Sequence, residues 1–277
     1  MSFFLLTPNL IDSATVTGTG WLPELPITNV QDRVLQNVAR SDGVTAPTIN
    51  IALDRPRPVR GIVLMRDTVG LSGSYRIIGS NNSDFSAPIY DSDVIERWPR
   101  IFDSANLEWD DPRFWDGKPL QEDIDGLPQD LIHVLPADIS AQYWRIELTD
   151  TGVNIGRIMI AGGWQPSLGP EYGATIAVED QTLVSEADAG TEYFNNRPRR
   201  RIARLRLPIL SKDEALQQVL ESQLRYGIQA EIFLIIDADD QLNLQRQSFV
   251  CRLQEPSAME YAFFDHNSAN FILRELL

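Results

Sequence analysis

The chain has 277 residues, of which 43% are hydrophobic and 23% are charged, and its formal net charge is −15 at pH 7. This length predicts one large or two ordinary globular domains. The acidic balance argues against nucleic acid as a partner, because a nucleic-acid surface needs positive charge. The single cysteine, Cys251, excludes an intrachain disulfide framework and a multi-cysteine zinc site.

The amino-terminal stretch MSFFLLTPN has no basic start and only a short apolar run, so it is unlike a secretory signal. No apolar run in the sequence approaches the roughly 20 residues of a membrane span. We therefore expect the chain to fold in the cytoplasm and not to insert into a membrane.

Short stretches rich in β-branched and aromatic residues follow one another through the first 165 residues, with no helical periodicity between them. In the last but one of them, Trp144, Ile146 and Leu148 alternate with more polar residues, which is typical of a strand with one buried face. Several short strands without intervening helices indicate a β-sandwich, here a jelly-roll-like one. The expected strands are Thr48–Asp54, Val59–Asp67, Ser74–Ser80, Gln142–Asp150 and Ile155–Trp164.

A long acidic insert, residues 102–130, interrupts these strands with nine Asp and Glu against two basic residues. A loop of this length is unusual unless it packs on itself or contacts a partner. Its aromatic residues Trp109, Phe114 and Trp115 are candidate contacts for a glycan or a protein partner. Alternatively, they anchor the insert onto its own domain.

The segment Gln165–Gly173 is rich in Pro, Gly and Ser and predicts a domain boundary. After it, RIARLRL (201–207) predicts a strand, with Ala203, Leu205 and Leu207 on one face. The stretch 211–227 predicts a helix, because Ser211 and Glu214 form a capping box and Gly227 suits the stop position. Its expected apolar stripe is Leu216, Val219, Leu220 and Leu224.

Four further strands complete an α+β domain, the third and fourth of them joined by the turn Asp265–Ser268. The chain is thus mainly β. We expect a sandwich at 1–165 with its insert at 102–130, a linker at 166–173 and an α+β assembly domain at 174–277.

No combination of residues typical of an enzyme is present. His133 and His266 lie far apart in the sequence, and neither a G-x-S-x-G turn nor a phosphate-binding loop occurs. The acidic residues Asp237, Asp239 and Asp240 fall where a turn is expected. Asp123–Gly126 resembles part of a calcium loop but lacks its remaining ligands, so a structural calcium ion stays open. We expect no enzyme, no catalytic residue, no metal site and no cofactor.

The arginine-rich stretch RPRRRIARLRLP (197–208) stands out in an acidic chain. Its surroundings oppose nucleic-acid binding, and no basic amphipathic helix is present for a membrane surface. Arginine is favoured where carboxylates are paired with two hydrogen bonds, so we predict a subunit contact with a neighbour or with the acidic insert. The candidate contact residues are Arg199, Arg200, Arg201, Arg204 and Arg206.

Three segments resemble the galactose-binding-like, or discoidin-like, β-sandwich family. They are TINIALDRPRPVRGIVLMRD (48–67), SGSYRIIGSNNSDFSAPIYDSD (72–93) and AQYWRIELTDTGVNIGRIMIAGGW (141–164). The match spans about residues 9 to 164, and the insert departs from the family's usual length. The resemblance implies a module that recognises host-surface glycans, which is the alternative function.

The whole chain also resembles baseplate or distal-tail proteins of tailed bacteriophages. The match runs from YWRIELTDTG through the arginine-rich strand to LSKDEALQQVLESQLRYG and IFLIIDADDQLNLQRQSFVCRL. This resemblance implies a structural virion protein of the tail tip that assembles in a homo-oligomeric ring and links tail tube, hub and fibres. It is the main functional expectation from the sequence.

Overall fold

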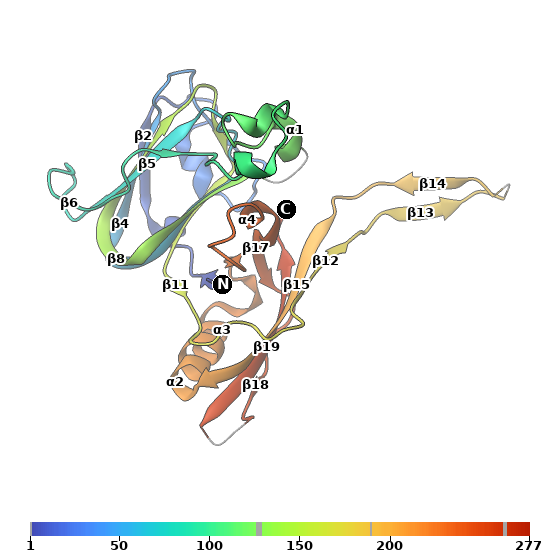
Figure 1. Cartoon of the computed structure of the whole chain (residues 1–277). Helices are drawn as coiled ribbons and strands as arrows, with labels where there is room; N and C mark the ends of the chain where they lie inside the picture. Colours follow the sequence, from blue (N-terminus) through green and yellow to red (C-terminus); the bar gives the residue numbers. More distant parts are fainter. Residues whose placement is uncertain (1, 126–128, 189, 263–264) are drawn as a thin grey trace. The chain divides into compact units, whose positions relative to one another are not determined.

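The structure is a computed structural model that describes residues 2–125, 129–188, 190–262 and 265–277. Two compact units are present, and Figure 1 follows the chain through both. The sandwich unit contains Pro8–Gly163 and Asp240–Arg246. The arm unit contains Met1–Thr7, Trp164–Asp239 and Gln247–Leu277.

This division corrects the expected domain bounds. The division after Gly163 lies beside the expected boundary, but the first residues of the chain belong to the second unit. The reason is strand pairing, because Phe4 lies opposite Ile235 and Leu6 opposite Phe233 in an antiparallel ladder. The expected linker 166–173 is part of the arm unit, and residues 240–246 belong to the sandwich unit.

The sandwich unit is built on two long strands, β4 and β8, which pair antiparallel with each other. Both curve along their length (Figure 1), and their register shifts between Ala52 and Arg57. Such irregularities bend a strand, which explains the curvature of β4 and β8. The described strands are β2 (Thr15–Thr19), β3 (Ala39–Arg40), β4 (Thr48–Met65), β5 (Ser74–Ser80), β6 (Pro88–Asp91), β7 (Ile95–Glu96), β8 (Asp130–Thr149), β9 (Asn154–Ile155) and β10 (Arg157–Ala161).

The main sheet of this unit has the order β10-β4-β8-β5-β6 within the described residues, with β2 on β4 and β7 on β5. Its core contains Trp144 and Ile146 from β8, as their alternation predicts, packed with Ile62 and Leu64 from β4. The short helical segments are η1 (Leu10–Ser13), η2 (Ile27–Gln31), η3 (Ser104–Asn106), η4 (Pro112–Phe114), α1 (Gln121–Ile124) and α4 (Leu244–Gln247). The last of these lies within LNLQRQSFVCRL (242–253), which its sequence pattern predicts to be one of the four further strands.

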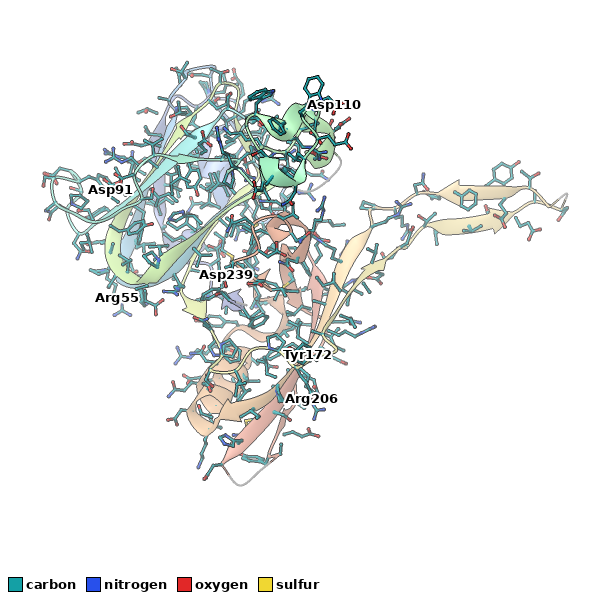
Figure 2. The ribbon with its side chains drawn as sticks, viewed as in Figure 1. Arg55, Asp91, Asp110, Tyr172, Arg206 and Asp239 are labelled. Atoms are coloured by element: carbon teal, nitrogen blue, oxygen red, sulfur yellow. The ribbon has the colours of Figure 1, made fainter. Side chains whose placement is uncertain are left out.

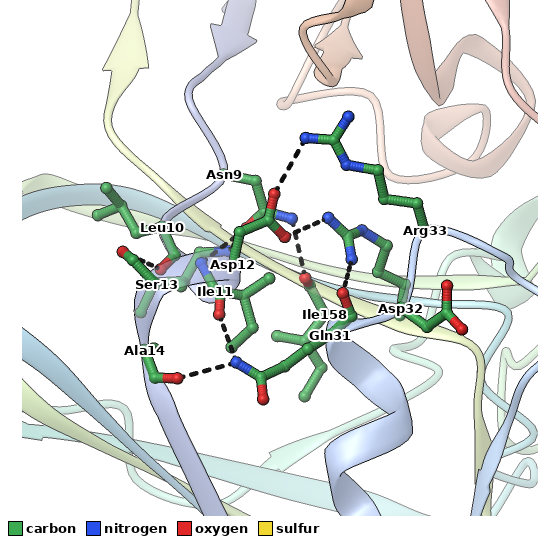
Figure 3. Close-up of polar contacts among 12 residues, drawn as sticks. Asn9, Leu10, Ile11, Asp12, Ser13, Ala14, Gln31, Asp32, Arg33 and Ile158 are labelled. Atoms are coloured by element: carbon green, nitrogen blue, oxygen red, sulfur yellow. Dashed lines mark hydrogen bonds and ion pairs between the residues drawn. The ribbon is translucent and has the colours of Figure 1, made fainter.

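A buried polar network ties η1 and η2 to β10 (Figure 3). Arg157 is 1% exposed and donates to the Gln31 carbonyl at 2.5 Å and to Asp12 at 2.5 Å. Asn9 donates to the Ile158 carbonyl at 3.1 Å. A buried guanidinium is tolerated only when its donors are satisfied, so this network is structural.

The arm unit is a sheet of order β11-β1-β16-β17-β19-β15-β12 within the described residues, with β18 on β19. Its core includes Ala203, Leu205 and Leu207, and the arginines between them are exposed, which confirms the predicted alternation. The strands are β1 (Phe4–Leu6), β11 (Gly163–Trp164), β12 (Thr175–Glu179), β15 (Arg200–Ser211), β16 (Ile232–Ile235), β17 (Ser248–Leu253), β18 (Met259–Glu260) and β19 (His266–Glu275).

The predicted helix of the arm unit is present, but only part of its predicted apolar stripe is buried. Ser211 caps it, accepting from Glu214 N at 3.2 Å, and Gly227 follows it with φ +60°. The helix runs through α2 (Lys212–Glu214), a π-helical segment η5 (Ala215–Glu221) and α3 (Ser222–Tyr226), before η6 (Gly227–Gln229). Val219 of the predicted stripe is buried beside Ala215, whereas Leu220 is 42% and Leu224 78% exposed, because the π-helical segment departs from the 3.6-residue period on which the stripe was predicted.

The remaining element is a two-stranded hairpin, β13 (Leu183–Glu186) and β14 (Glu192–Asn195), which we call the arm. It projects from β12 and β15 as a long ribbon (Figure 1). The sequence pattern of this stretch predicts no element. The predicted fold class is confirmed: the chain is mainly β, with a sandwich followed by an α+β unit.

Candidate functional site

The acidic insert of the sandwich unit folds on itself through short turns that aspartates cap. Asp103 accepts from Ala105 N at 3.0 Å, and Asp111 accepts from Arg113 N at 2.8 Å. Asp123 accepts from Leu120 N at 2.9 Å. Part of the insert's acidity therefore has a local structural reason, because aspartate satisfies backbone donors at the start of a turn or helix. Residues 126–128 of the insert, including Gly126 of the calcium-like motif, lie outside the described residues.

Arg113 and Asp111 form the central ion pair of the insert. Nε and Nη2 of Arg113 lie 2.9 and 2.8 Å from the two carboxylate oxygens. These hydrogen bonds lower the pKa of Asp111 to about 2. The guanidinium also lies over the Phe102 ring, 4.8 Å from its centroid, and 3.7 Å from Asp123. One side chain thus joins three parts of the insert.

Gly117 joins the later part of the insert to its beginning by backbone hydrogen bonds. Gly117 has φ +63°, and its carbonyl accepts from Ile101 N at 2.8 Å and from Phe102 N at 3.0 Å. A Cβ at this position would lie 2.6 Å from the Phe102 oxygen. Both the backbone angle and the close approach therefore favour glycine.

The segment between β7 and the insert is fixed by a buried ion pair. Arg97 donates to both oxygens of Asp67, at 3.2 and 2.9 Å, and the two side chains are 4% and 0% exposed. The Arg97 guanidinium lies over the Trp98 ring, 4.3 Å from its centroid. Trp98 is buried and donates to the Val69 carbonyl. The insert therefore starts from a rigid base.

The predicted contact residues of the insert divide into two kinds. Trp109 and Trp115 are each 79% exposed, so they do not anchor the insert onto its own domain. Phe114 is half-buried and meets Trp115 edge-to-face, with ring centroids 5.3 Å apart. Buried Ile124, Gly117 and Pro119 fill the inner side of the insert instead. Figure 2 labels Asp110, which follows Trp109, on the outer surface of the insert.

A cavity of about 300 Å³ lies beneath the insert, within the sandwich unit. Phe102, Arg113 and Asp123 line it from the insert, and Trp98 lines it from the base. The segment 240–246 closes the other side with Gln241, Leu242, Gln245 and Arg246. No sequence pattern indicates this cavity, because residues 240–246 join the sandwich unit only through folding.

Only some of the five arginines predicted to contact a neighbouring subunit are free to do so. Arg201 forms an ion pair with Glu275 at 2.5 Å, and the two side chains are 15% and 6% exposed. This pair is largely buried, so Arg201 is not available for a contact with another subunit. Arg199 pairs with Asp180 at 2.9 Å, and Arg206 lies 3.8 Å from Glu171. These partners belong to the arm unit itself and not to the acidic insert.

Arg204 and Arg206 line a cavity of about 350 Å³ beside Tyr172, which is fully exposed. Figure 2 labels Tyr172 and Arg206. Arg200 is half-buried, and Glu179 lies opposite it in the strand ladder.

The other titratable residues, His133, Cys251 and Asp237, have structural roles. His133 is buried between Tyr75, at 3.3 Å, and Tyr90, at 2.8 Å, and burial lowers its pKa to about 4. Burial also raises the pKa of the Cys251 thiol, which points to the Ile232 carbonyl. Asp237 accepts from Asp239 N at 3.2 Å, as a turn residue does.

Within the described residues, no group of three or more His, Cys, Asp or Glu side chains could hold a metal ion. In the same part of the chain, no helix is long and apolar enough to cross a membrane.

No protein-family model and no curated protein matches the chain. The solved structures that it resembles include a fucose-binding module of Streptococcus pneumoniae, at 11% identity over 56% of this chain and 97% of that chain, with a TM-score of 0.38. The family 32 carbohydrate-binding module of C. perfringens NanJ, solved with galactose, is 14% identical over 56% of this chain and 98% of that chain, with a TM-score of 0.36.

A chitosan-binding module from a Paenibacillus sp. IK-5 chitosanase/glucanase is 18% identical over 56% of this chain and 100% of that chain, with a TM-score of 0.38. None of the three is a phage tail protein, and the resemblance to phage tail proteins stays a prediction. Likenesses at this level assign neither a family nor a ligand to the chain.

Proposed function

We propose that the sandwich unit binds carbohydrate through the acidic insert. The observation that carries the proposal is the 79% exposure of both Trp109 and Trp115 on a segment that is otherwise braced by its own hydrogen bonds. Single exposed apolar side chains are common, but two exposed indoles on one braced segment form a candidate surface for a ligand. The flat face of an indole matches the C–H face of a hexose, and its rigidity keeps the entropy loss on binding small.

The charge of the insert defines the class of glycan. Glu108 and Asp110 flank Trp109, Asp116 follows Trp115, and all three are exposed. Carboxylates accept hydrogen bonds from sugar hydroxyls and attract ammonium groups, but they repel sialic and uronic acids. The proposed ligand is therefore a neutral or amino-bearing glycan.

The cavity beneath the insert, which Trp109 and Trp115 do not line, offers a second place for a sugar in the same unit. Its volume of about 300 Å³ is at the lower end of the range for small-molecule sites. It combines an aromatic wall from Phe102 and Trp98 with polar groups from Arg113, Asp123 and Gln129. This combination of an apolar wall and a few convergent polar groups is typical of sites that orient a polar ligand.

A glycan array followed by calorimetry tests the proposal. We expect wild-type protein to bind neutral or amino-bearing oligosaccharides, and Trp115→Ala or Trp109→Ala to weaken binding by about tenfold or more, as loss of an aromatic anchor does. The matched control is Tyr261→Ala, an aromatic that is 73% exposed in the arm unit, which should bind as wild type does. Absence of binding by wild-type protein across the array would overturn the proposal.

The proposed role is that of a binding protein and not an enzyme. Incubation of the purified protein with any oligosaccharide that it binds should leave the oligosaccharide intact by mass spectrometry. Cleaved product would contradict this part of the proposal.

A second candidate function is a structural component of a phage tail tip, assembled in a ring and linking tail tube, hub and fibres. One observation favours an assembly role: the arm exposes apolar side chains on an unsupported ribbon. Imaging of particles that carry a tagged copy tests it. A label at the tail tip is the expected result, and a label on the capsid or absent from particles would end this candidate.

A further inference from the structure

The arm carries an apolar surface that nothing in its own unit covers. Val184 and Phe194 lie opposite each other in the ladder and are 57% and 61% exposed. On the other face, Leu183 and Tyr193 are 53% and 60% exposed. Two-stranded ribbons are marginally stable by themselves, and contiguous exposed apolar residues mark interaction surfaces. The arm is therefore built to be covered by another chain.

Charge is distributed unevenly along the same ribbon. At its tip, Glu186 lies directly opposite Glu192, and exposed Asp188 lies in the turn between them. Like charges directly opposite each other destabilise an antiparallel pair. The tip therefore carries an electrostatic strain that a cation from outside the chain would relieve.

The root of the arm carries the opposite charge. Arg197 is exposed and forms no salt bridge with any described residue, whereas half-buried Arg200 lies opposite Glu179 in the strand ladder. Exposed Arg199 lies between them in sequence and pairs with Asp180. The ribbon thus has an acidic tip and an arginine-rich root, joined by exposed apolar residues.

We infer that the arm binds a second copy of this chain, with the acidic tip of one arm against the arginine-rich root of the other. The two complementary charge clusters occur on one chain, and so the same ribbon supplies both halves of the contact. The apolar residues between them are then covered by their counterparts. The outer edges of β12 and β13, which have no strand partner among the described residues, add backbone groups that can pair between copies.

This inference goes beyond glycan binding and supplies the contact that the assembly candidate needs. It concerns copies of one chain in solution, so it is measured without phage particles or glycans. A chain that self-associates but is absent from particles would retain the inference and remove the assembly candidate.

Charge reversal followed by analytical ultracentrifugation of the full chain tests the inference. We expect wild-type protein to form oligomers as its concentration rises, and less so at high salt, because salt screens exposed charges. Glu186→Lys with Glu192→Lys reverses the tip, and Arg197→Glu with Arg200→Glu reverses the root. Each pair of changes should weaken association by about tenfold or more, since like charges then meet.

The four changes combined provide the decisive measurement. With all four changes the tip is basic and the root is acidic, so opposite charges meet again. Association should then return to within about threefold of wild type. Restoration also shows that the single reversals did not simply unfold the arm. The matched control is Glu24→Lys with Glu255→Lys, two exposed acidic residues outside the arm, which should associate as wild type does. A monomeric wild-type chain, or oligomers that neither reversal weakens, would overturn the inference.

Discussion

The acidic insert and the arm both expose aromatic side chains, but they are supported in different ways. The insert is fixed by capped turns, the Arg113–Asp111 pair and a buried base at Arg97. The arm has only its two-stranded ladder, in which all eight strand residues are exposed. A braced surface suits a small ligand, because little conformational entropy is lost on binding. An unsupported ribbon suits a second chain, which supplies the missing layer.

The largest effect is expected from removing the buried ion pair at the base of the insert. Asp67→Ala leaves the Arg97 guanidinium buried without its partner, so we expect the sandwich unit to lose about 3–5 kcal/mol of unfolding free energy. Denaturant unfolding followed by tryptophan fluorescence measures this, since five of the six tryptophans lie in the sandwich unit.

The matched change in the arm unit is Arg199→Ala, which removes an exposed pair with Asp180. We expect no measurable change in the unfolding midpoint, because exposed ion pairs contribute little. Equal losses in the two variants would contradict the claim that the insert is braced and the arm is not.

The second test measures how the stability of the sandwich unit depends on pH, which we expect His133 to control in part. Above pH 6.5 the imidazole is neutral in both folded and unfolded chains, so its contribution is constant. Below that pH, His133 binds a proton in the unfolded chain but stays neutral in the folded chain, because burial lowers its pKa in the folded state to about 4. Stability should therefore fall by about 3 kcal/mol between pH 6.5 and pH 4.

Unfolding free energies measured across this pH range for wild type and His133→Gln check the acid prediction. The variant should lose the part of the pH dependence that His133 causes, even if it is less stable throughout. The same slope in both proteins would show that folding does not lower the pKa of His133.

The smallest effect is expected from Gly117→Ala. A positive φ and a Cβ 2.6 Å from the Phe102 oxygen should loosen the insert by about 1–3 kcal/mol and weaken glycan binding. Gly43→Ala is the control, because Gly43 also has a positive φ but no atom within 4 Å of its Cβ position. Calorimetric titration with the bound glycan should separate the two. Equal binding by both would show that the shape of the insert does not matter for the ligand.

The sequence by itself determined the features that depend on local patterns. Alternation placed Trp144 and Ile146 in one core and Ala203, Leu205 and Leu207 in the other, because residues two apart share a face of a strand. The capping box at Ser211 and the glycine after the helix were also confirmed, since caps act within a few residues.

Only the tertiary structure decided which segments meet and which side chains remain exposed. The pairing of Phe4 with Ile235, the joining of 240–246 to the sandwich and the π-helical shift that leaves Leu224 exposed depend on contacts far apart in sequence or on packing. The same holds for Arg201, whose partner Glu275 lies in another strand, and for the exposed Trp109 and Trp115. Residue type sets the chemistry of a side chain, whereas its burial is set by the neighbours that folding brings to it.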